Sequence, residues 1–240
     1  VDDGRNRAPD ARLAMVSPSH QYPMGVTMSL ARRLALLEWA NEANAFILED
    51  DYDSEFRYEC VPAPALKALD GGNGRVIYIG TLSKLLAPGL RLGFLVAPDG
   101  LIDALRTVRN GAVYRVPMPL QATAADFIGN GHLGTHIRRS KALYTERRAA
   151  LLSAIKSEGG GLLTVPTAST GLHLVTELPE QCDDQPLAVA ARERQIGVTP
   201  LSGYFVDASG TKRQGLLMGF GNTRSESMEG AIQTLCSLIE

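Results

Sequence analysis

The stretch Ala45-Phe46-Ile47-Leu48-Glu49-Asp50-Asp51-Tyr52-Asp53 joins a short apolar run to an acidic end. Such a run suits a strand buried on both faces of a sheet, ended here by the acidic residues 49–53. Two similar runs follow: Val76-Ile77-Tyr78-Ile79, which ends at Gly80-Thr81-Leu82-Ser83-Lys84, and Leu92-Gly93-Phe94-Leu95-Val96, which Pro98 closes. We therefore expect three buried strands with polar residues at their ends.

Helical periodicity separates these runs. Residues 11–16 predict a further strand, and residues 27–43 predict a helix with Leu30, Leu34 and Leu37 on its apolar face. Arg32, Arg33 and Glu38 are expected on the solvated face of that helix. Strands that alternate with helices indicate a parallel or mixed α/β sheet, whose ligands bind at the carboxyl ends of the strands.

The second half of the chain has a different pattern. Residues 101–110, 119–130 and 133–157 predict helices, and Gly159-Gly160-Gly161 ends the last of them. The remainder predicts a small α+β unit with strands near 162–166, 171–176, 198–201 and 215–220, a helix near 185–195 and another from about 225. We assign 1–132 to part of a large domain and 133–240 to a linking helix and a small C-terminal domain.

Composition excludes several classes of function. Twenty-four Lys and Arg against 26 Asp and Glu leave a net charge of −2, so DNA contact is expected to come from outside this segment. Three scattered cysteines, Cys60, Cys182 and Cys236, fit neither a disulfide scaffold nor a zinc ribbon and indicate a cytoplasmic setting. No apolar run approaches the roughly 18 residues of a membrane span. The polar start without an initiator Met suggests a fragment.

The most informative polar residues follow two neighbouring strands: Asp50 and Tyr52 after the first, Ser83 and Lys84 after the second. A strand-end lysine must reach water or be desolvated until its pKa falls, and a depressed pKa makes a nucleophilic amine. Such an amine forms a Schiff base with the aldehyde of pyridoxal phosphate, which also needs an acidic partner for its pyridine nitrogen. The sequence offers Asp50 for the nitrogen, Tyr52 for the ring hydroxyl, and a set of phosphate donors: Thr81, Ser83 and Arg91.

The same residues also fit roles without a cofactor. A lone strand-end lysine is usually a surface residue, and an acidic cluster is usually a solvated loop. His132 and His136 lack the glutamate of a zinc-binding HExxH motif, and Phe56 stands where a calcium loop needs glycine, so no metal is expected. A phosphatase of the haloacid dehalogenase class, with Asp51 and Asp53 at its centre, is a distant enzyme alternative.

Three segments resemble a known family. Residues 17–26 (SPSHQYPMGV), 49–58 (EDDYDSEFRY) and 80–93 (GTLSKLLAPGLRLG) resemble the effector domain of MocR/GabR-type regulators. These are bacterial GntR-family transcription factors in which a winged helix-turn-helix is fused to a fold-type-I aminotransferase-like domain. The resemblance covers nearly the whole chain, and segment 49–58 is the most specific. It implies a three-layer α/β/α large domain, here incomplete, and a small α+β C-terminal domain.

The resemblance also implies roles for individual residues. Lys84 matches the lysine that forms the internal aldimine, Asp50 the partner of the pyridine nitrogen, and Tyr52 the tyrosine beside the ring oxygen. The residues that match the phosphate-binding set are Thr81, Ser83 and Arg91.

Two positions depart from the aminotransferase pattern. His20 and Gln21 occupy the turn in which related aminotransferases carry an asparagine that reaches the ring hydroxyl, but Tyr22 stands before Pro23 here, as is typical of the regulators. The strand at 215–220 lacks the arginine that binds the substrate carboxylate in aminotransferases, and Arg213 is the nearest candidate. The family's domain also begins upstream of residue 17, with a glycine-rich phosphate contact and an aromatic residue that stacks on the pyridine ring.

Three hypotheses of function follow. In the first, pyridoxal phosphate on Lys84 reacts with a small amino compound or amino acid, the small domain shifts against the large one, and a DNA-binding module absent from this chain responds. In the second, the chain is an active class I/II aminotransferase acting on an amino acid, with Lys84 as general base and acid. In the third, it is a dimerisation scaffold without a cofactor. The resemblance implies a homodimer in each case.

Overall fold

A computed structural model describes residues 1–58, 63–112, 115–166, 170–206 and 213–239, so Cys60 lies outside the described residues. The described residues form two compact units. The first unit comprises those within 1–21, 26–54 and 61–138, and the second those within 22–25, 55–60 and 139–240. Two short segments near the N-terminus therefore belong to the unit that is otherwise built from the C-terminal half.

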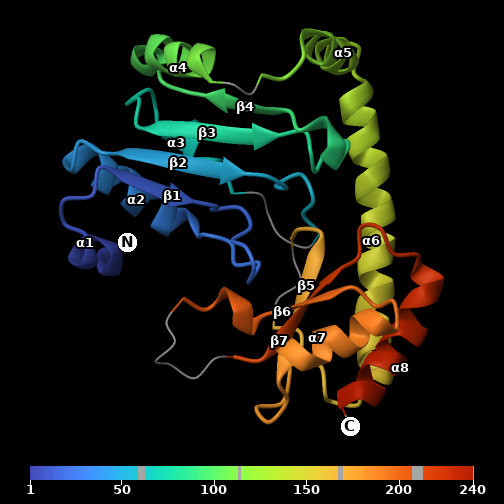
Figure 1. Cartoon of the computed structure of the whole chain (residues 1–240). Helices are drawn as coiled ribbons and strands as arrows, with labels where there is room; N and C mark the ends of the chain where they lie inside the picture. The colour runs from blue at the N-terminus through green and yellow to red at the C-terminus, as the bar shows by residue number, and fades with distance from the viewer. Residues whose placement is uncertain (59–62, 113–114, 167–169, 207–212, 240) are drawn as a thin grey trace. The chain divides into compact units, whose positions relative to one another are not determined.

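The first unit contains a four-stranded sheet in the order β1 (Leu13–Val16), β2 (Phe46–Asp51), β3 (Val76–Thr81) and β4 (Gly93–Val96) (Figure 1). The first three strands are parallel, and β4 is antiparallel to β3. The expected mixed sheet is thus confirmed. The carboxyl ends of β1, β2 and β3 and the amino end of β4 all meet at one edge.

The burial of the three predicted strands differs from expectation. In β2 only Ile47 and Glu49 are fully buried, and in β3 only Val76 and Gly80. In β4 all four residues are exposed, so the prediction of strands buried on both faces is wrong for β2, β3 and β4. Strand β2 also extends through Asp51, because its pairing with β3 continues to Asp51 and Gly80; Asp50 therefore lies inside the strand rather than after it.

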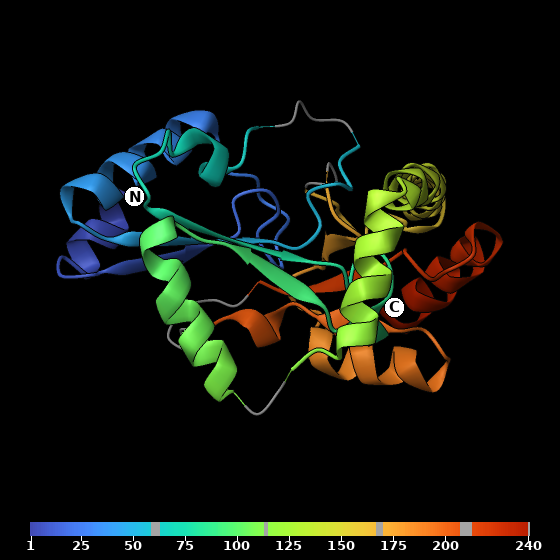
Figure 2. The same cartoon turned by 90° about the horizontal axis from the view of Figure 1, so that it is seen from above.

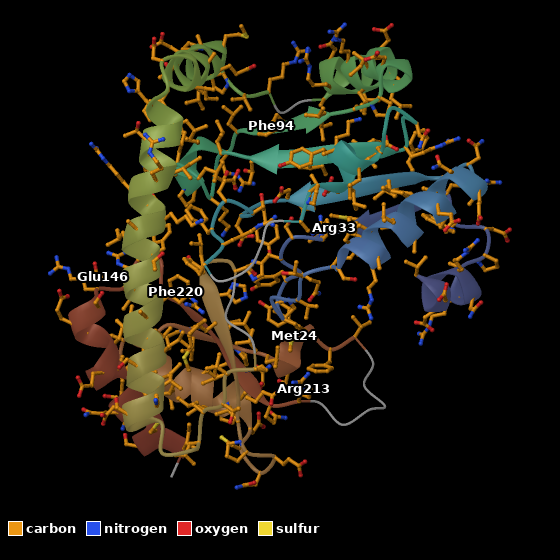
Figure 3. All side chains as sticks on the ribbon, turned by 180° about the vertical axis from the view of Figure 1, so that it is seen from behind. Met24, Arg33, Phe94, Glu146, Arg213 and Phe220 are labelled. Atoms are coloured by element: carbon orange, nitrogen blue, oxygen red, sulfur yellow. The ribbon has the colours of Figure 1, made fainter. Side chains whose placement is uncertain are left out.

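Gly80 allows a close approach between β3 and β4. It pairs with Phe94 in the antiparallel register, and a Cβ on Gly80 would lie 2.2 Å from a carbon of the Phe94 ring. The absence of that Cβ lets the ring lie against β3 (Figure 3). This contact holds β4 beside the polar end of β3.

The helices of the first unit are α1 (Asp2–Arg7), α2 (Leu30–Glu42), α3 (Leu66–Leu69), α4 (Asp99–Gly111) and α5 (Met118–Gly129), with a 3₁₀ turn at Pro88–Leu90. Helices α2 and α3 lie on one face of the sheet and α4 on the other (Figure 2). The sequence predicted α2, α4 and α5, whereas α1 and α3 are too short for a periodic signal. None of the described helices is both long and apolar enough to cross a membrane.

The buried face of α2 agrees only in part with the predicted one, since Leu37 is buried and Arg32 and Glu38 are exposed as expected. Leu30 and Leu34 are each 49% exposed, whereas Arg33 is completely buried together with residues of the same face: Leu36, Leu37, Trp39 and Ala40. An arginine was expected on the solvated face because its charge is costly to bury. The tertiary structure reverses this preference by giving each of the three guanidinium nitrogens a carbonyl acceptor.

Arg33 extends from α2 into this set of acceptors (Figure 3). Its nitrogens donate to three backbone carbonyls at 2.7–3.1 Å, those of Pro18, Met28 and Pro64. Its Nη1 also lies 4.0 Å from Oε1 of Glu49, which is equally buried. Glu49 in turn accepts hydrogen bonds from the backbone N–H groups of Leu66 and Lys67, each at 2.8 Å. Arg33 and Glu49 therefore tie β1, β2, α2 and α3 together at the acidic end of β2.

The C-terminal part of the second unit begins within α6 (His132–Glu158), which ends before Gly159 as predicted. A three-stranded antiparallel sheet follows in the order β5 (His173–Glu177), β7 (Gly215–Gly219) and β6 (Val198–Pro200). Helices α7 (Asp184–Glu193) and α8 (Met228–Ile239) and 3₁₀ turns at Ser202–Tyr204 and Ser225–Ser227 complete it. The strand predicted near 162–166 is wrong, because Thr164 forms only an isolated bridge with Glu177.

Replacing Arg33 should destabilise the first unit strongly. The variant Arg33→Ala removes the buried cation beside Glu49 and the donor to the carbonyls of Pro18, Met28 and Pro64, and we expect a loss of about 3–5 kcal/mol in the free energy of unfolding. The neighbouring exposed Arg32 is the matched control, and Arg32→Ala should change stability by no more than about 0.5 kcal/mol. Urea unfolding of both variants checks this, and equal stabilities would contradict the role given to Arg33.

Candidate functional site

One edge of the four-stranded sheet gathers the polar residues singled out in the sequence. Each strand of the first unit contributes to this edge, because the parallel strands end there and β4 begins there. Strand by strand, the contributions are His20 after β1, Asp50 and Tyr52 at the end of β2, Thr81, Ser83 and Lys84 at the end of β3, and Arg91 before β4. We refer to these seven residues as the edge set.

Asp50 and Thr81 share one face of the sheet. Ile47 packs in the core with residues of α2, and Glu49 bonds to α3, so alternation along β2 directs Asp50 to the opposite face. Asp50 pairs with Ile79 in the parallel register, and Thr81 follows two residues later on the same face. The carboxylate and the hydroxyl therefore approach the edge from the same side.

Asp50 lies in a field of negative charge. Its burial raises the pKa of its carboxyl group, and the charges of Asp51 and Asp53 raise it further. A carboxylate whose pKa is raised in this way binds a proton, or a cationic N–H group, more strongly than a solvated one does. The group is thus electrostatically suited to a positively charged ligand such as a protonated pyridine nitrogen.

The loop between Leu82 and Leu92 carries the remaining donors. The backbone N–H of Leu82 donates to the carbonyl of Leu92 at 2.9 Å and closes the neck of the loop. Next to it, the N–H of Ser83 donates to Oγ1 of Thr81 at 3.1 Å. Arg91 stands at the other side of the neck with a positive φ of 48° and an exposed side chain. The hydroxyls of Thr81, at the end of β3, and of Ser83, together with the guanidinium of Arg91, form a set of polar groups suited to a phosphate.

Lys84 lies in the turn that follows β3, and its side chain is exposed. A strand-end lysine either reaches water or is desolvated. Among the described residues of the chain, Lys84 is exposed to solvent. The amine is accessible to a carbonyl compound at the edge set.

His20 and Tyr52 are joined by hydrogen bonds in which a further residue takes part. His20 and Asp53 are almost completely buried, and Nδ1 of His20 lies 2.7 Å from Oδ2 of Asp53. The hydroxyl of Tyr52 donates to the backbone carbonyl of His20 at 2.7 Å and lies 3.4 Å from its Nδ1. Sequence reasoning missed the contact between Asp53 and His20, because no periodicity connects position 53 with position 20.

Tyr22, the departure from the aminotransferase pattern, belongs to the second unit. Its hydroxyl lies 2.7 Å from that of Tyr204, and its ring packs edge-on against Tyr204 and His173 with 5.3 Å between centroids. Burial and the bond to Tyr204 raise the pKa of Tyr22 to about 12. Met24 follows and packs against an apolar cluster formed by Val175, Leu201 and Leu217. The segment after His20 thus docks onto the small sheet.

Arg213 also belongs to the second unit. Its guanidinium forms an ion pair with Glu177, which lies opposite Gly215 in the antiparallel pairing of β5 with β7. The side chain is about half exposed. A ligand carboxylate would therefore compete with Glu177 for this arginine.

The segment 49–58 contributes to both units. Its first half forms the acidic end of β2, and its second half enters the core of the second unit. There Phe56 is completely buried against Tyr144, with 5.0 Å between ring centroids, and the Tyr58 hydroxyl donates to the carbonyl of Gly171 at 3.0 Å. The guanidinium of Arg148 stacks over the Tyr58 ring. The length of this specific motif thus reflects two separate structural roles.

A mixed sheet of this topology, followed by a small α+β unit, has the architecture of one class of protein, the fold-type-I pyridoxal-phosphate-dependent transferases. A multiple substrate aminotransferase from Thermococcus profundus has this fold, with a TM-score of 0.87 and 31% identity over 99% of this chain and 58% of that one. The profile of the aminotransferase class I and II family matches residues 6–213. The chain belongs to this family.

Two curated relatives of this chain are described as regulatory proteins. A protein described as an uncharacterized HTH-type transcriptional regulator, YhdI of Bacillus subtilis, is 39% identical over 93% of this chain and 47% of its own length. A probable rhizopine catabolism regulatory protein of Rhizobium meliloti, MocR, is 37% identical over 95% of this chain and 46% of its own length. The resemblance to the aminotransferase-like domain of MocR-type regulators is confirmed. The chain spans about half the length of these relatives.

Removing the charge of Asp50 should stabilise the chain when no ligand is added. Because the folded-state pKa of Asp50 is raised, the folded chain binds more protons than the unfolded one, and stability is lost as the pH rises through that pKa. We therefore expect Asp50→Asn to raise the thermal unfolding midpoint at pH 7 and to have little effect below the ordinary carboxyl pKa of about 4. Calorimetry at both pH values checks this, and a lower midpoint at pH 7 would contradict it.

Proposed function

We propose that this chain is the pyridoxal-phosphate-binding, effector-sensing domain of a MocR/GabR-like transcriptional regulator. The observation that carries the proposal is the single sheet edge at which an acidic residue, a tyrosine, a hydroxyl-bearing loop, an arginine and a lysine meet. The donor set matches the cofactor part by part, since it offers a negative group, phosphate donors and a primary amine.

Each residue of the edge set has a role in this proposal. Asp50 holds the proton of the pyridine nitrogen, for which its raised pKa makes it suited. Thr81, Ser83 and Arg91 bind the phosphate, and Tyr52, supported by His20, lies beside the ring oxygen. Lys84 supplies the amine. When bound, pyridoxal phosphate supplies an aldehyde that condenses with primary amines and a ring that withdraws electrons from the adduct.

The kinship with regulators supports sensing over turnover. YhdI and MocR are more similar to this chain than is the aromatic-amino-acid aminotransferase 1 of Thermococcus litoralis, which is 31% identical. That archaeal relative supports the alternative, an active class I/II aminotransferase that uses the same residues. In the sensing proposal the ligand is a small amino compound or amino acid, the chain acts as a homodimer, and DNA is bound through a separate helix-turn-helix module.

The path of the chain offers a physical means of sensing. Two segments leave the edge set and continue directly into the second unit, one from His20 to Tyr22 and one from Tyr52 to Phe56. Each is anchored there by aromatic packing. A ligand that binds the edge set better in one arrangement of these segments shifts the population toward that arrangement by its differential affinity.

Removing the Lys84 amine should abolish covalent attachment of the cofactor. We expect Lys84→Ala to lose the long-wavelength absorbance that wild-type chain develops with pyridoxal phosphate, while circular dichroism stays unchanged because an exposed side chain leaves no core cavity. Lys141, exposed on α6, provides the matched control, and Lys141→Ala should keep the absorbance. Absorbance that survives in Lys84→Ala would assign the attachment to another amine.

The two candidate arginines should differ in their effect on cofactor affinity. Arg91→Ala removes a charge-assisted phosphate contact and should weaken binding of pyridoxal phosphate about tenfold or more. Arg213→Ala should leave this affinity nearly unchanged, because Arg213 pairs with Glu177 in the second unit. Fluorescence titration with pyridoxal phosphate measures both, and the reverse order would mean that the two roles are wrongly assigned.

A further inference from the structure

The second unit contains a pocket that the proposed function does not use. It has a volume of about 190 Å³ and lies between α6, α8, the paired strands β6 and β7, and the loop at 195–197. Protein interiors are packed so closely that few voids exceed the size of a water molecule. A pocket of this size beside a core is therefore unusual, and no residue of the edge set lines it.

The floor of the pocket is apolar. The residues that form it belong to the core of the second unit and are each at most 7% exposed: Leu151, Val198, Met218, Met228, Ile232 and Leu235. Apolar atoms beside empty space lack the dispersion contacts that a filled core provides. A ligand with an apolar body would supply these contacts.

The mouth of the pocket is lined by uncharged residues. They include the side chains of Gln195, Thr223 and Ser227, together with Gly197 and Gly219. A Cβ at either glycine would meet no atom from another part of the described chain within 4 Å, so side chains leave the entrance open. The described residues that line the pocket carry no charge, and a charged group inside would lose its hydration without gaining a partner. The pocket is therefore suited to an uncharged ligand.

The volume restricts the size of that ligand. Pockets that hold drug-sized molecules have volumes of about 300–1,000 Å³, whereas an apolar cavity of about 150 Å³ stays free of water and binds a single ring such as benzene. At about 190 Å³ this pocket resembles the second kind. It is too small for a peptide or a helix, and it accommodates a molecule of about one ring.

We propose that this pocket is a second ligand site, which takes a small uncharged apolar molecule of about one aromatic ring in size. Its chemistry is the opposite of that of the edge set, which offers charged and hydrogen-bonding groups. The inference does not depend on the proposed function, because the two sites share no residue.

A ligand at this site would contact β7 from one face. Met218 lines the pocket, whereas the preceding Leu217 belongs to the apolar cluster on the opposite face of the strand, against which Met24 packs. Met24 lies in the segment 22–25 that docks onto the small sheet. The ligand and this segment would therefore hold the same strand from its two faces.

Methionine methyl groups report directly on the pocket. In chain labelled with ¹³C at these methyls, toluene should shift the signals of Met218 and Met228 in a saturable manner, with the two signals assigned through Met218→Leu and Met228→Leu. The remaining methionines do not line the pocket and should shift little: Met15, Met24, Met28 and Met118. A response without saturation in wild type, or shifts of equal size at all the methionines, would overturn the proposal without reference to any other variant.

Narrowing the pocket should weaken binding. Ala231 lines the pocket from α8, and Ala231→Leu should weaken the binding of toluene about tenfold or more, because the larger side chain takes up space in which the ring would be buried. Ala149, exposed on α6 and outside the pocket, provides the matched control, and Ala149→Leu should keep the wild-type affinity. Equal affinities in the two variants would place the toluene elsewhere.

A charged probe tests the chemical class of the ligand. Benzoate has the ring of toluene with a carboxylate in place of the methyl group, and it should not shift Met218 or Met228 at about ten times the toluene Kd. Benzoate that binds as tightly as toluene would refute an uncharged site. These titrations need no pyridoxal phosphate, so their outcome is independent of whether the proposed function holds.

Discussion

The parallel pairing of β2 with β3 is the constraint on which the site depends. It places Asp50 beside Ile79 and Asp51 beside Gly80, so that the acidic end of one strand and the hydroxyl and lysine of the next leave the sheet together. The antiparallel β4 returns Arg91 to the same edge, because the Leu82–Leu92 bond closes the intervening loop. Residues far apart in the chain, from His20 to Arg91, thus lie at the same end of the sheet, and no single segment contains all of them.

This arrangement concentrates negative charge where it destabilises the unliganded chain. Burial raises the pKa of both Glu49 and Asp50, but the two carboxyl groups differ in the hydrogen bonds and charges around them. Glu49 is compensated by two backbone N–H groups and Arg33. Asp50 faces the charges of Asp51 and Asp53 instead, as expected of a residue kept for a cationic ligand rather than for stability. The same strand end therefore contains one carboxylate that is compensated within the fold, Glu49, and one that is not, Asp50, to which we assign the pyridine nitrogen.

Sequence reasoning predicted the mixed sheet and most of the helices, because strand and helix periodicity are local properties. The roles given to the edge set stay predictions. Sequence reasoning failed where the burial or the contacts of a residue depend on a partner that is distant in the sequence. Arg33 is buried because three carbonyls from separate segments surround it, and Asp53 is buried in contact with His20. Residues 162–166 have the composition of a strand, yet only Thr164 pairs with β5. The exposure of β4 likewise depends on tertiary packing that its apolar residues do not specify.

Covalent attachment of pyridoxal phosphate at Lys84 is the property that gives the rest of the edge set its proposed roles. It can be tested by borohydride reduction of wild-type chain saturated with pyridoxal phosphate, followed by proteolysis and mass spectrometry of the peptides. We expect one phosphopyridoxyl label per chain, carried by the peptide that contains Lys84. Labels scattered over exposed lysines, with Lys84 no more modified than the others, would contradict the proposed cofactor site.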